Sequence, residues 1–192
     1  MFVLSIFLAC ESEEIIAKER YDTYCGLCHG YEGEGYLAPQ ANALANPQFL
    51  AASTDEFLRY AIIYGRPTTK MSPWGEEVGG PLNAQDVERI ITHMRTWETL
   101  PRADIHDIVI SGDPENGAII YAAQCSICHG AEGEGGSAMS LNNPTFHESV
   151  SDGFLLHALE EGREGTTMGS YRDTLSQEER YDLVSFIRSF EE

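Results

Sequence analysis

The feature that most constrains this chain is a short pattern, Cys-x-x-Cys-His, which occurs twice at a separation of 100 residues. The two copies are Cys25-Gly-Leu-Cys28-His29 and Cys125-Ser-Ile-Cys128-His129. At the same shift Tyr21 matches Tyr121, and the glycine- and glutamate-rich residues 30–35 match residues 130–135. Any fold for this chain must therefore build the same cysteine and histidine site twice.

The repeat continues through the rest of each half once two short deletions are placed in the second copy. A shift of 97 residues aligns Asn46-Pro47-x-Phe49 with Asn143-Pro144-x-Phe146, Phe57 with Phe154, Gly65-Arg66 with Gly162-Arg163, Met71 with Met168, and Trp74 with Tyr171. A shift of 93 then aligns Arg95 with Arg188 and Trp97 with Phe190. Each copy is a complete unit of about 80–90 residues, so the chain is a tandem duplication.

The duplication predicts the domain organisation of the chain. We expect an apolar segment at residues 1–10, a first domain over 11–100, a linker over 101–113 and a second domain over 114–192. A chain of 192 residues is long enough for two small domains. Domains of this size bury little surface, so their cores would be thin without a bound group.

The pattern of apolar and capping residues predicts helices. Residues 13–25 lack Gly and Pro and show helical spacing, and Ser53-Thr54-Asp55-Glu56 is typical of a helix start, with an end near Gly65. Asn83 and Ser176 begin the last helix of each copy, and Ser176 has the pattern of a capping box. No segment alternates as a strand does. We therefore expect an all-α fold.

The charge balance limits the classes of partner. The chain has 12 Lys and Arg against 31 Asp and Glu, a net charge of −19. This charge argues against nucleic acid and against a plain anionic membrane surface, and it favours a basic partner. Solubility alone is the alternative explanation of the acidity. No apolar stretch reaches the roughly 18–20 residues of a transmembrane helix, so we expect no membrane span.

Cys-x-x-Cys-His is the attachment motif of a c-type haem, in which two thioethers hold the macrocycle and the adjacent imidazole binds the iron. The two motifs thus predict two haem c groups. A joint zinc site is the first alternative, but 96 residues separate Cys28 from Cys125, where zinc ribbons have about 15–20. A thioredoxin-like motif needs a βαβ context, which the sequence lacks. Two structural disulfides would not explain the histidines.

The chain resembles a tandem pair of class I cytochrome c domains, as in the small diheme cytochromes c of bacterial periplasms. The resemblance covers residues 13–192 and rests on the haem motif, the Gly-rich loop, Gly-Arg followed by Met, and a last helix ending in an aromatic residue. It implies that the first and last helices of each domain cross around one covalently bound haem. It also implies the axial ligand pairs His29/Met71 and His129/Met168.

The methionine positions support this ligand assignment independently. Of five methionines, only Met71 and Met168 lie at matching places in both copies. A Met/His pair binds haem iron and raises its reduction potential, whereas core packing is the alternative role of a single methionine. The other histidines have no histidine counterpart at the matching place of the other copy, and we expect packing or surface roles for them: His93, His106, His147 and His157.

Further residues are expected around each haem. Arg66 and Arg163 suit haem propionates or loop carbonyls, with a solvated surface position as the alternative. Trp74 and Tyr171 are expected to wall the haem with a polar tip at its edge. The resemblance implies that Pro39 offers its carbonyl to the ring N–H of His29. Met139 takes the place of this proline in the second copy and can still accept the bond.

The N-terminus and the cofactor together predict an exported protein. Residues 2–9 are apolar and end at Cys10, which resembles a lipoprotein signal with an acylated cysteine, although no Lys or Arg precedes the run. An ordinary trimmed segment is the alternative. Since the resemblance implies haem attachment outside the cytoplasmic membrane, we expect a periplasmic location, with a lipid anchor at Cys10.

Electron transfer is the function that these features predict. If protein side chains fill both axial positions, no open site remains for a substrate, so we expect a carrier rather than an enzyme. We expect its partners to be redox proteins with a basic docking surface. The first alternative is a dedicated electron-transfer subunit of a dehydrogenase, oxidase or photosynthetic complex. A diheme peroxidase is less favoured, because it needs a displaceable ligand and usually a longer chain.

Overall fold

The computed structural model describes residues 13–191, and within this range it is all-α, as expected. The only extended pairing in these residues is an isolated bridge between Gly75 and Leu82. Residues 13–21 are helical. The other elements of the first half are the π-helix η1 (Asp22–Gly26), α2 (Leu27–His29), α3 (Pro47–Ala52), α4 (Asp55–Tyr64), the 3-10 helix η2 (Glu76–Val78) and α5 (Ala84–Arg95).

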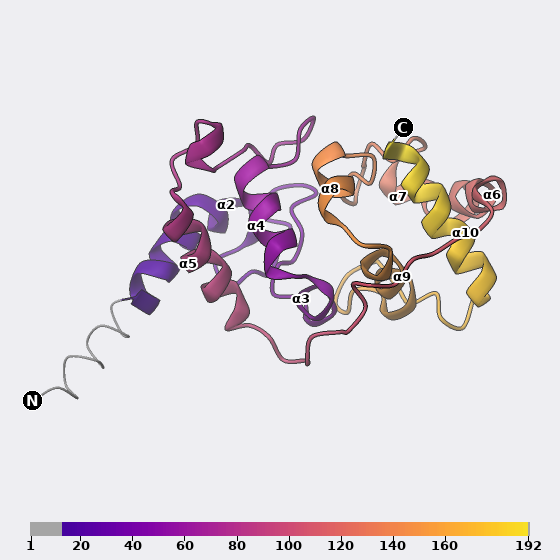
Figure 1. Ribbon diagram of the computed structural model, residues 1–192, viewed down its shortest axis with the longest axis horizontal. Helices are drawn as coiled ribbons and strands as arrows, with labels where there is room; N and C mark the ends of the chain where they lie inside the picture. Colours follow the sequence, from indigo (N-terminus) through magenta and orange to yellow (C-terminus); the bar gives the residue numbers. More distant parts are fainter. Residues whose placement is uncertain (1–12, 192) are drawn as a thin grey trace, which may run out of the picture.

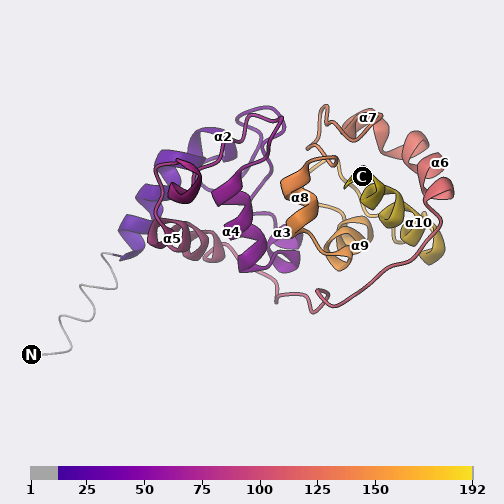
Figure 2. The same ribbon diagram turned by 45° about the horizontal axis from the view of Figure 1, so that its top comes forward.

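The second half repeats this order and lies beside the first (Figure 1). Its elements are α6 (Pro114–Gln124), α7 (Ser126–His129), α8 (Pro144–Ser149), α9 (Asp152–Glu161), α10 (Gln177–Arg188) and the 3-10 helix η3 (Ser189–Glu191). Figure 2 shows the segment between α5 and α6 running along one edge of the second half. No helix in residues 13–191 is long and apolar enough to cross a membrane.

The predicted helix ends are confirmed at the atomic level. Thr54 caps α4 by accepting a hydrogen bond from the amide of Phe57 at 2.9 Å, and the helix ends at Gly65. Asn83 caps α5, and Ser176 caps α10 with a complete capping box. Each cap satisfies an amide that has no partner within its helix, which explains why these helices start where the sequence predicts.

The first and last helices of each domain pack against each other. In the second domain α6 lies so close to α10 that a Cβ at Gly117 would be 2.1 Å from the carbonyl oxygen of Asp182. In the first domain, Tyr21 meets Trp97 edge to face, with 5.0 Å between ring centroids. Arg20 also pairs with Asp86 of α5 at 2.9 Å. The helix crossing expected from the resemblance is therefore present in both domains.

An arginine at the end of each last helix fixes the two middle helices. Arg95 donates to the carbonyls of Leu50 and Ser53 at 3.0 and 2.7 Å and to the carboxylate of Asp55 at 2.7 Å. The guanidinium thus ties together the end of α3 and the first turn of α4. The second copy repeats the arrangement: Arg188 donates to the His147 and Val150 carbonyls and to the Asp152 carboxylate.

The two domains meet through these middle helices. Helix α3 packs on α9, and α4 packs on α8, so each middle helix contacts the helix of the other copy that matches its own neighbour. Phe57 lies 5.1 Å from its counterpart Phe154, measured between ring centroids. Phe49 and Phe146 complete the cluster, with centroids 6.2 Å and 6.3 Å from the facing rings. The interface therefore has approximate two-fold symmetry, because each of these contacts from the first copy to the second has a matching contact in the reverse direction.

The Arg95 contact predicts an acid-dependent part of stability. Burial acts to raise the pKa of Asp55, but the hydrogen bonds and charges of Arg95 and Arg102 outweigh it and lower the pKa below the ordinary 3.8. A lowered pKa stabilises the fold above 3.8, and this stabilisation is lost as the pH falls through the folded-state value. We expect Asp55→Asn to be less stable than wild type at neutral pH, with the difference shrinking below about pH 4.

Urea unfolding followed by circular dichroism, from about pH 7 down to about pH 3, measures this difference. Asp107→Asn is the control, because Asp107 is exposed and makes no ion pair in the described residues. A difference that stays constant down to the lowest pH would contradict the proposed role of the Asp55 carboxylate.

Candidate functional site

The two cysteine pairs lie at the C-terminal end of the first helix of each domain. Cys25 belongs to the π-helix and Cys28 to α2, while Cys125 sits at the kink between α6 and α7. None of these four thiols forms a disulfide. Burial raises the pKa of Cys25 to about 12 and that of Cys125 to about 11. The pairs are thus free thiols, and the disulfide alternative is not realised.

The described residues also exclude a joint zinc site. Within residues 13–191, no three or more His, Cys, Asp or Glu side chains gather in a way that could hold a metal ion. The four cysteines therefore form two separate sites, one in each domain, rather than one tetrahedral site.

Each motif histidine is oriented by a backbone carbonyl. Nδ1 of His29 lies 2.9 Å from the carbonyl oxygen of Asn42, and Nδ1 of His129 lies 2.9 Å from that of Met139. A carbonyl only accepts, so Nδ1 carries the proton and Nε2 keeps its lone pair. Burial lowers the pKa of both rings, which keeps them neutral. A neutral imidazole with a fixed Nδ1–H and a free Nε2 suits a haem iron ligand.

The structure corrects the role expected for Pro39. The amide of Ala38 donates to the carbonyl of Cys28 at 3.1 Å, and the amide of Ala138 makes the same bond to the carbonyl of Cys128 at 3.0 Å. Ala38 and Ala138 are therefore matching residues. The next matching residues are Asn42 and Met139, which both accept from a histidine. The extra residues of the first copy are therefore 39–41, and Pro39 is part of the insertion. The Met139 carbonyl lies beside His129, where the sequence analysis places it.

The two anchoring residues also contact each other across the domain interface. The side-chain amide of Asn42 lies 3.5 Å from the sulfur of Met139. Beside them, Nε2 of Gln40 donates to the carbonyl of Gly136 at 2.6 Å. The loops that orient the two histidines are thus packed against one another, which brings the two sites together.

The methionine loops have the same backbone frame in both domains. The amide of Arg66 donates to the carbonyl of Met71 at 2.8 Å, and Arg163 donates to Met168 at 2.7 Å. Inside each loop a threonine hydroxyl donates to the arginine carbonyl and accepts from the methionine amide. The sequence analysis does not predict a role for these threonines, Thr69 and Thr166, although they match each other at the 97-residue shift.

Gly65 and Gly162 allow each methionine loop to fold back on the preceding helix. Their φ angles are +64° and +66°, which L residues rarely adopt. A Cβ at Gly65 would be 2.6 Å from the carbonyl oxygen of Met71, and one at Gly162 would be 2.7 Å from that of Met168. The glycines of the Gly-Arg motif are therefore required by both conformation and space.

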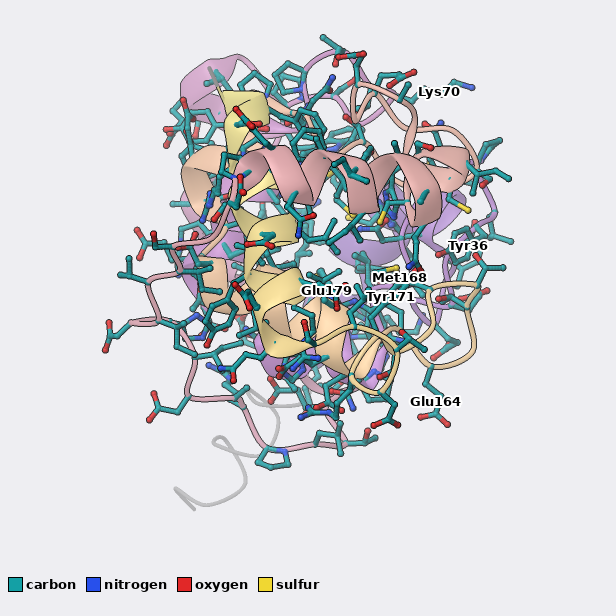
Figure 3. The ribbon with its side chains drawn as sticks, turned by 90° about the vertical axis from the view of Figure 1, so that its right-hand side faces the viewer. Tyr36, Lys70, Glu164, Met168, Tyr171 and Glu179 are labelled. Carbon is teal, nitrogen blue, oxygen red and sulfur yellow. The ribbon has the colours of Figure 1, made fainter. Side chains whose placement is uncertain are left out.

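The aromatic residues after each methionine lie near the attachment motifs. Burial, with the neighbouring Cys125 and Cys128, raises the pKa of Tyr171. Figure 3 shows Tyr171 beside Met168, inward from the exposed Glu164. In the first domain, Trp74 meets Tyr24 edge to face at 5.5 Å, directly before the first motif cysteine. In the second domain, Tyr171 therefore lies near the cysteine pair.

Arg66 and Arg163 are half-buried against the phenylalanines of the domain interface. Arg66 lies over the rings of Phe57 and Phe146 at 5.5 and 5.7 Å, and Arg163 lies over Phe154 at 5.4 Å. Each donates to the carbonyl of the preceding glycine, at 3.4 and 3.0 Å. Burial lowers the pKa of both to about 10, and neither pairs with a carboxylate in the described residues. Each guanidinium thus contacts a loop carbonyl and is only partly exposed to solvent.

The remaining histidines take packing or surface positions, as expected. His93 packs against the rings of Tyr21 and Trp97. His147 is buried with Nε2 2.6 Å from the carbonyl of Leu141, and His157 lies 2.9 Å from Gln48. His106 is exposed.

Comparison with known proteins identifies the family of the chain. The sequence model of the family described as cytochrome c oxidase, cbb3-type, subunit III matches residues 16–94 and again residues 112–187. The chain therefore belongs to this cytochrome c family, with one match in each half, and its domains carry out haem-based electron transfer. Among solved structures, it is similar to a chain of the reducing HAO-like protein complex of Kuenenia stuttgartiensis. The TM-score is 0.56 at 22% identity, over 91% of this chain and 95% of that chain.

The close approach at Gly65 predicts a local sensitivity of the site. We expect Gly65→Ala to lower the free energy of unfolding by about 2–4 kcal/mol, because backbone strain adds to overpacking against Met71. Gly79→Ala is the matched control: its φ is +88°, but no atom lies within 4 Å of the added Cβ. We expect about 1–2 kcal/mol there, from strain alone. Equal losses in urea unfolding would contradict the packing of Gly65 against the methionine loop.

Proposed function

We propose that the chain carries two c-type haems, one per domain, and transfers electrons with His29/Met71 and His129/Met168 as axial ligands. The observation that carries this proposal is the duplication of the whole arrangement. Each domain has two free thiols, an imidazole fixed through Nδ1 and a methionine in an identical backbone frame. A bound haem iron supplies the Fe(II)/Fe(III) couple, and the protein tunes it through axial ligands, hydrogen bonds and burial.

The residues of each domain would favour electron transfer by holding the ligands still. The Asn42 and Met139 carbonyls prevent the histidine rings from rotating, and the threonine-braced turns limit motion of the methionines. A site whose two axial positions are occupied by fixed side chains leaves none for a substrate, so we propose a carrier rather than a diheme peroxidase. The contact between the Asn42 and Met139 loops supports passage of electrons between the two sites.

A dedicated subunit of a larger redox complex is the second candidate. The family description names a subunit of an oxidase, which favours this candidate over a freely diffusing shuttle. Both share the same chemistry, and co-purification with a stable partner distinguishes them. For either, we propose export to the periplasm and a domain division within residues 101–113. The proposed lipid anchor at Cys10 lies outside the described residues, and the mass of the mature N-terminal peptide tests it.

The axial ligands are tested by replacing one methionine at a time. We expect the oxidised wild type to show the near-infrared band of sulfur-to-iron ligation. Met71→His or Met168→His should remove about half of this band and lower the reduction potential of one haem only, since the thioether raises it. Met94→Leu is the control, because Met94 is buried in the core at 3% exposure.

A pyridine haemochrome assay on the same proteins should give two covalently bound haems per chain. One haem, or haem that is extracted by acidic acetone, would refute the duplicated site. Rapid binding of carbon monoxide to one ferrous haem of the wild type would show an open sixth position and would favour the enzyme alternative.

We propose a basic redox partner from the charges near each site. Part of the acidity is neutralised within the chain, because Glu160 pairs with both Arg172 and Arg180, and Glu161 pairs with Arg172. The acids of the Gly-rich loops are different. They are exposed, they make no ion pair in the described residues, and they lie in the loop that follows each motif histidine: Glu32, Glu34, Glu132 and Glu134. A basic partner would therefore be attracted to the surface beside each motif.

Salt dependence tests this attraction. With a basic electron acceptor we expect stopped-flow rates to be high at low ionic strength and to fall as salt shortens the Debye length to roughly 10 Å at about 0.1 M. An acidic acceptor of similar potential is the control, and its rate should rise with salt. If the acids serve only solubility, the rates with both acceptors should not change with salt concentration. That result would refute the basic partner.

A further inference from the structure

We propose that two buried asparagines, Asn46 and Asn143, act as positioning residues that each hold the methionine loop of the other domain. The inference rests on the proposed function, because it concerns how Met71 and Met168 are kept in place. It goes further in assigning the support of each ligand to the opposite half of the chain. Asn46 would position the loop of Met168, and Asn143 would position the loop of Met71.

The contacts are reciprocal. The side-chain amide of Asn46 donates to the carbonyl of Glu164 at 2.9 Å, and that of Asn143 donates to the carbonyl of Pro67. Asn46 and Asn143 match at the 97-residue shift, and so do Pro67 and Glu164. The same bond is thus made twice, once in each direction across the interface.

The orientation of both side-chain amides is fixed by a second bond. Asn46 caps α3, its Oδ1 accepting from the amide of Phe49 at 3.1 Å, and Asn143 caps α8 by accepting from the amide of Phe146 at 3.2 Å. Since the oxygen is committed to the cap, the Nδ2 group must point away from it, toward the other domain. Both side chains are buried, at 6% and 1% exposure, so a lost bond would leave a polar group without water.

The accepting carbonyls lie at the tip of the turn that carries each methionine. The amides of Thr69 and Thr166 close these turns onto the carbonyls of Arg66 and Arg163, at 3.0 Å in both. Pro67 and Glu164 are the second residues of the turns, and a residue with positive φ follows each. This is the pattern of a type II turn, in which the second carbonyl is not used inside the turn. It is therefore free to accept from the other domain.

The two loops are not held equally. The hydroxyl oxygen of Thr145 in the second domain also lies 2.7 Å from the carbonyl oxygen of Gly65 and accepts from Arg66 at 3.3 Å, so the Met71 loop has additional contacts. Its counterpart Gln48 instead bonds His157 and does not reach the Met168 loop. The better-held loop is also the strained one, because Thr68 has a φ of 68°, which is unfavourable for a β-branched residue. We therefore expect loss of the Asn46 bond to loosen the Met168 loop more than loss of the Asn143 bond loosens the Met71 loop.

Hydrogen exchange of the haem-loaded protein tests the assignment. Serine keeps the helix cap but is too short to reach across the interface. We expect Asn46→Ser to speed amide exchange in residues 162–168 by roughly three- to tenfold, the effect of one lost hydrogen bond, and to leave residues 65–71 unchanged. We expect Asn143→Ser to speed exchange in residues 65–71 by a smaller factor and to leave residues 162–168 unchanged.

Asn83→Ser is the matched control, because Asn83 caps α5 without any bond to the second domain, and it should change neither loop. Asn46→Asp and Asn143→Asp provide a second pair of variants that keep the cap oxygen and remove the donor. Exchange that rises only in the domain of the mutation, or equally in both loops, would overturn the proposal.

The near-infrared band separates this proposal from the proposed function. In Asn46→Ser the part of the band that comes from the second domain should weaken, and the part from the first domain should remain. The Met71→His and Met168→His variants show which part of the band belongs to which domain. A wild type without the band would refute methionine ligation, while crossed exchange would still establish the cross-domain support. A normal band with no crossed exchange would overturn the cross-domain support and leave the ligands intact.

Discussion

The guanidinium of Arg95, with Arg188 in the second copy, is the contact on which the arrangement of each domain depends. It joins the last helix to two backbone carbonyls and to a carboxylate at the junction of the two middle helices. These middle helices carry the phenylalanines and the capping asparagines that face the other domain. The geometry of the interface therefore begins with a contact inside each domain, between its last helix and its middle helices.

The interface in turn determines the surroundings of both candidate haem sites. Arg66 and Arg163 are half-buried against the shared phenylalanines, and the loops that anchor His29 and His129 touch through Asn42 and Met139. The methionine loops are bonded from across the boundary as well. Although each domain contains a full set of candidate ligands, both the proximal and the distal side of each site border the other half of the chain.

The sequence predicts the parts of this structure that depend on local chemistry. The caps at Thr54, Asn83 and Ser176 follow from side chains that bond nearby amides, and the attachment motifs follow from their spacing. The anchor of His29 is misplaced at Pro39, because an insertion of three residues can be located only by the backbone bonds on either side of it. The cross-domain bonds of Asn46 and Asn143 could not be predicted, because a sequence repeat carries no information about how its two copies pack against each other.

The near-symmetric interface has a consequence for how strong it must be. Matching surfaces that meet about a two-fold axis are what homodimers use, and a homodimer must associate at the low concentration of its free subunits. Here residues 101–113 join the two halves, so their association is intramolecular and occurs at an effective concentration that reaches the millimolar range for short flexible linkers. A cluster of four phenylalanines and the hydrogen bonds around it are then sufficient, although the same surfaces on separate chains would dissociate far more readily.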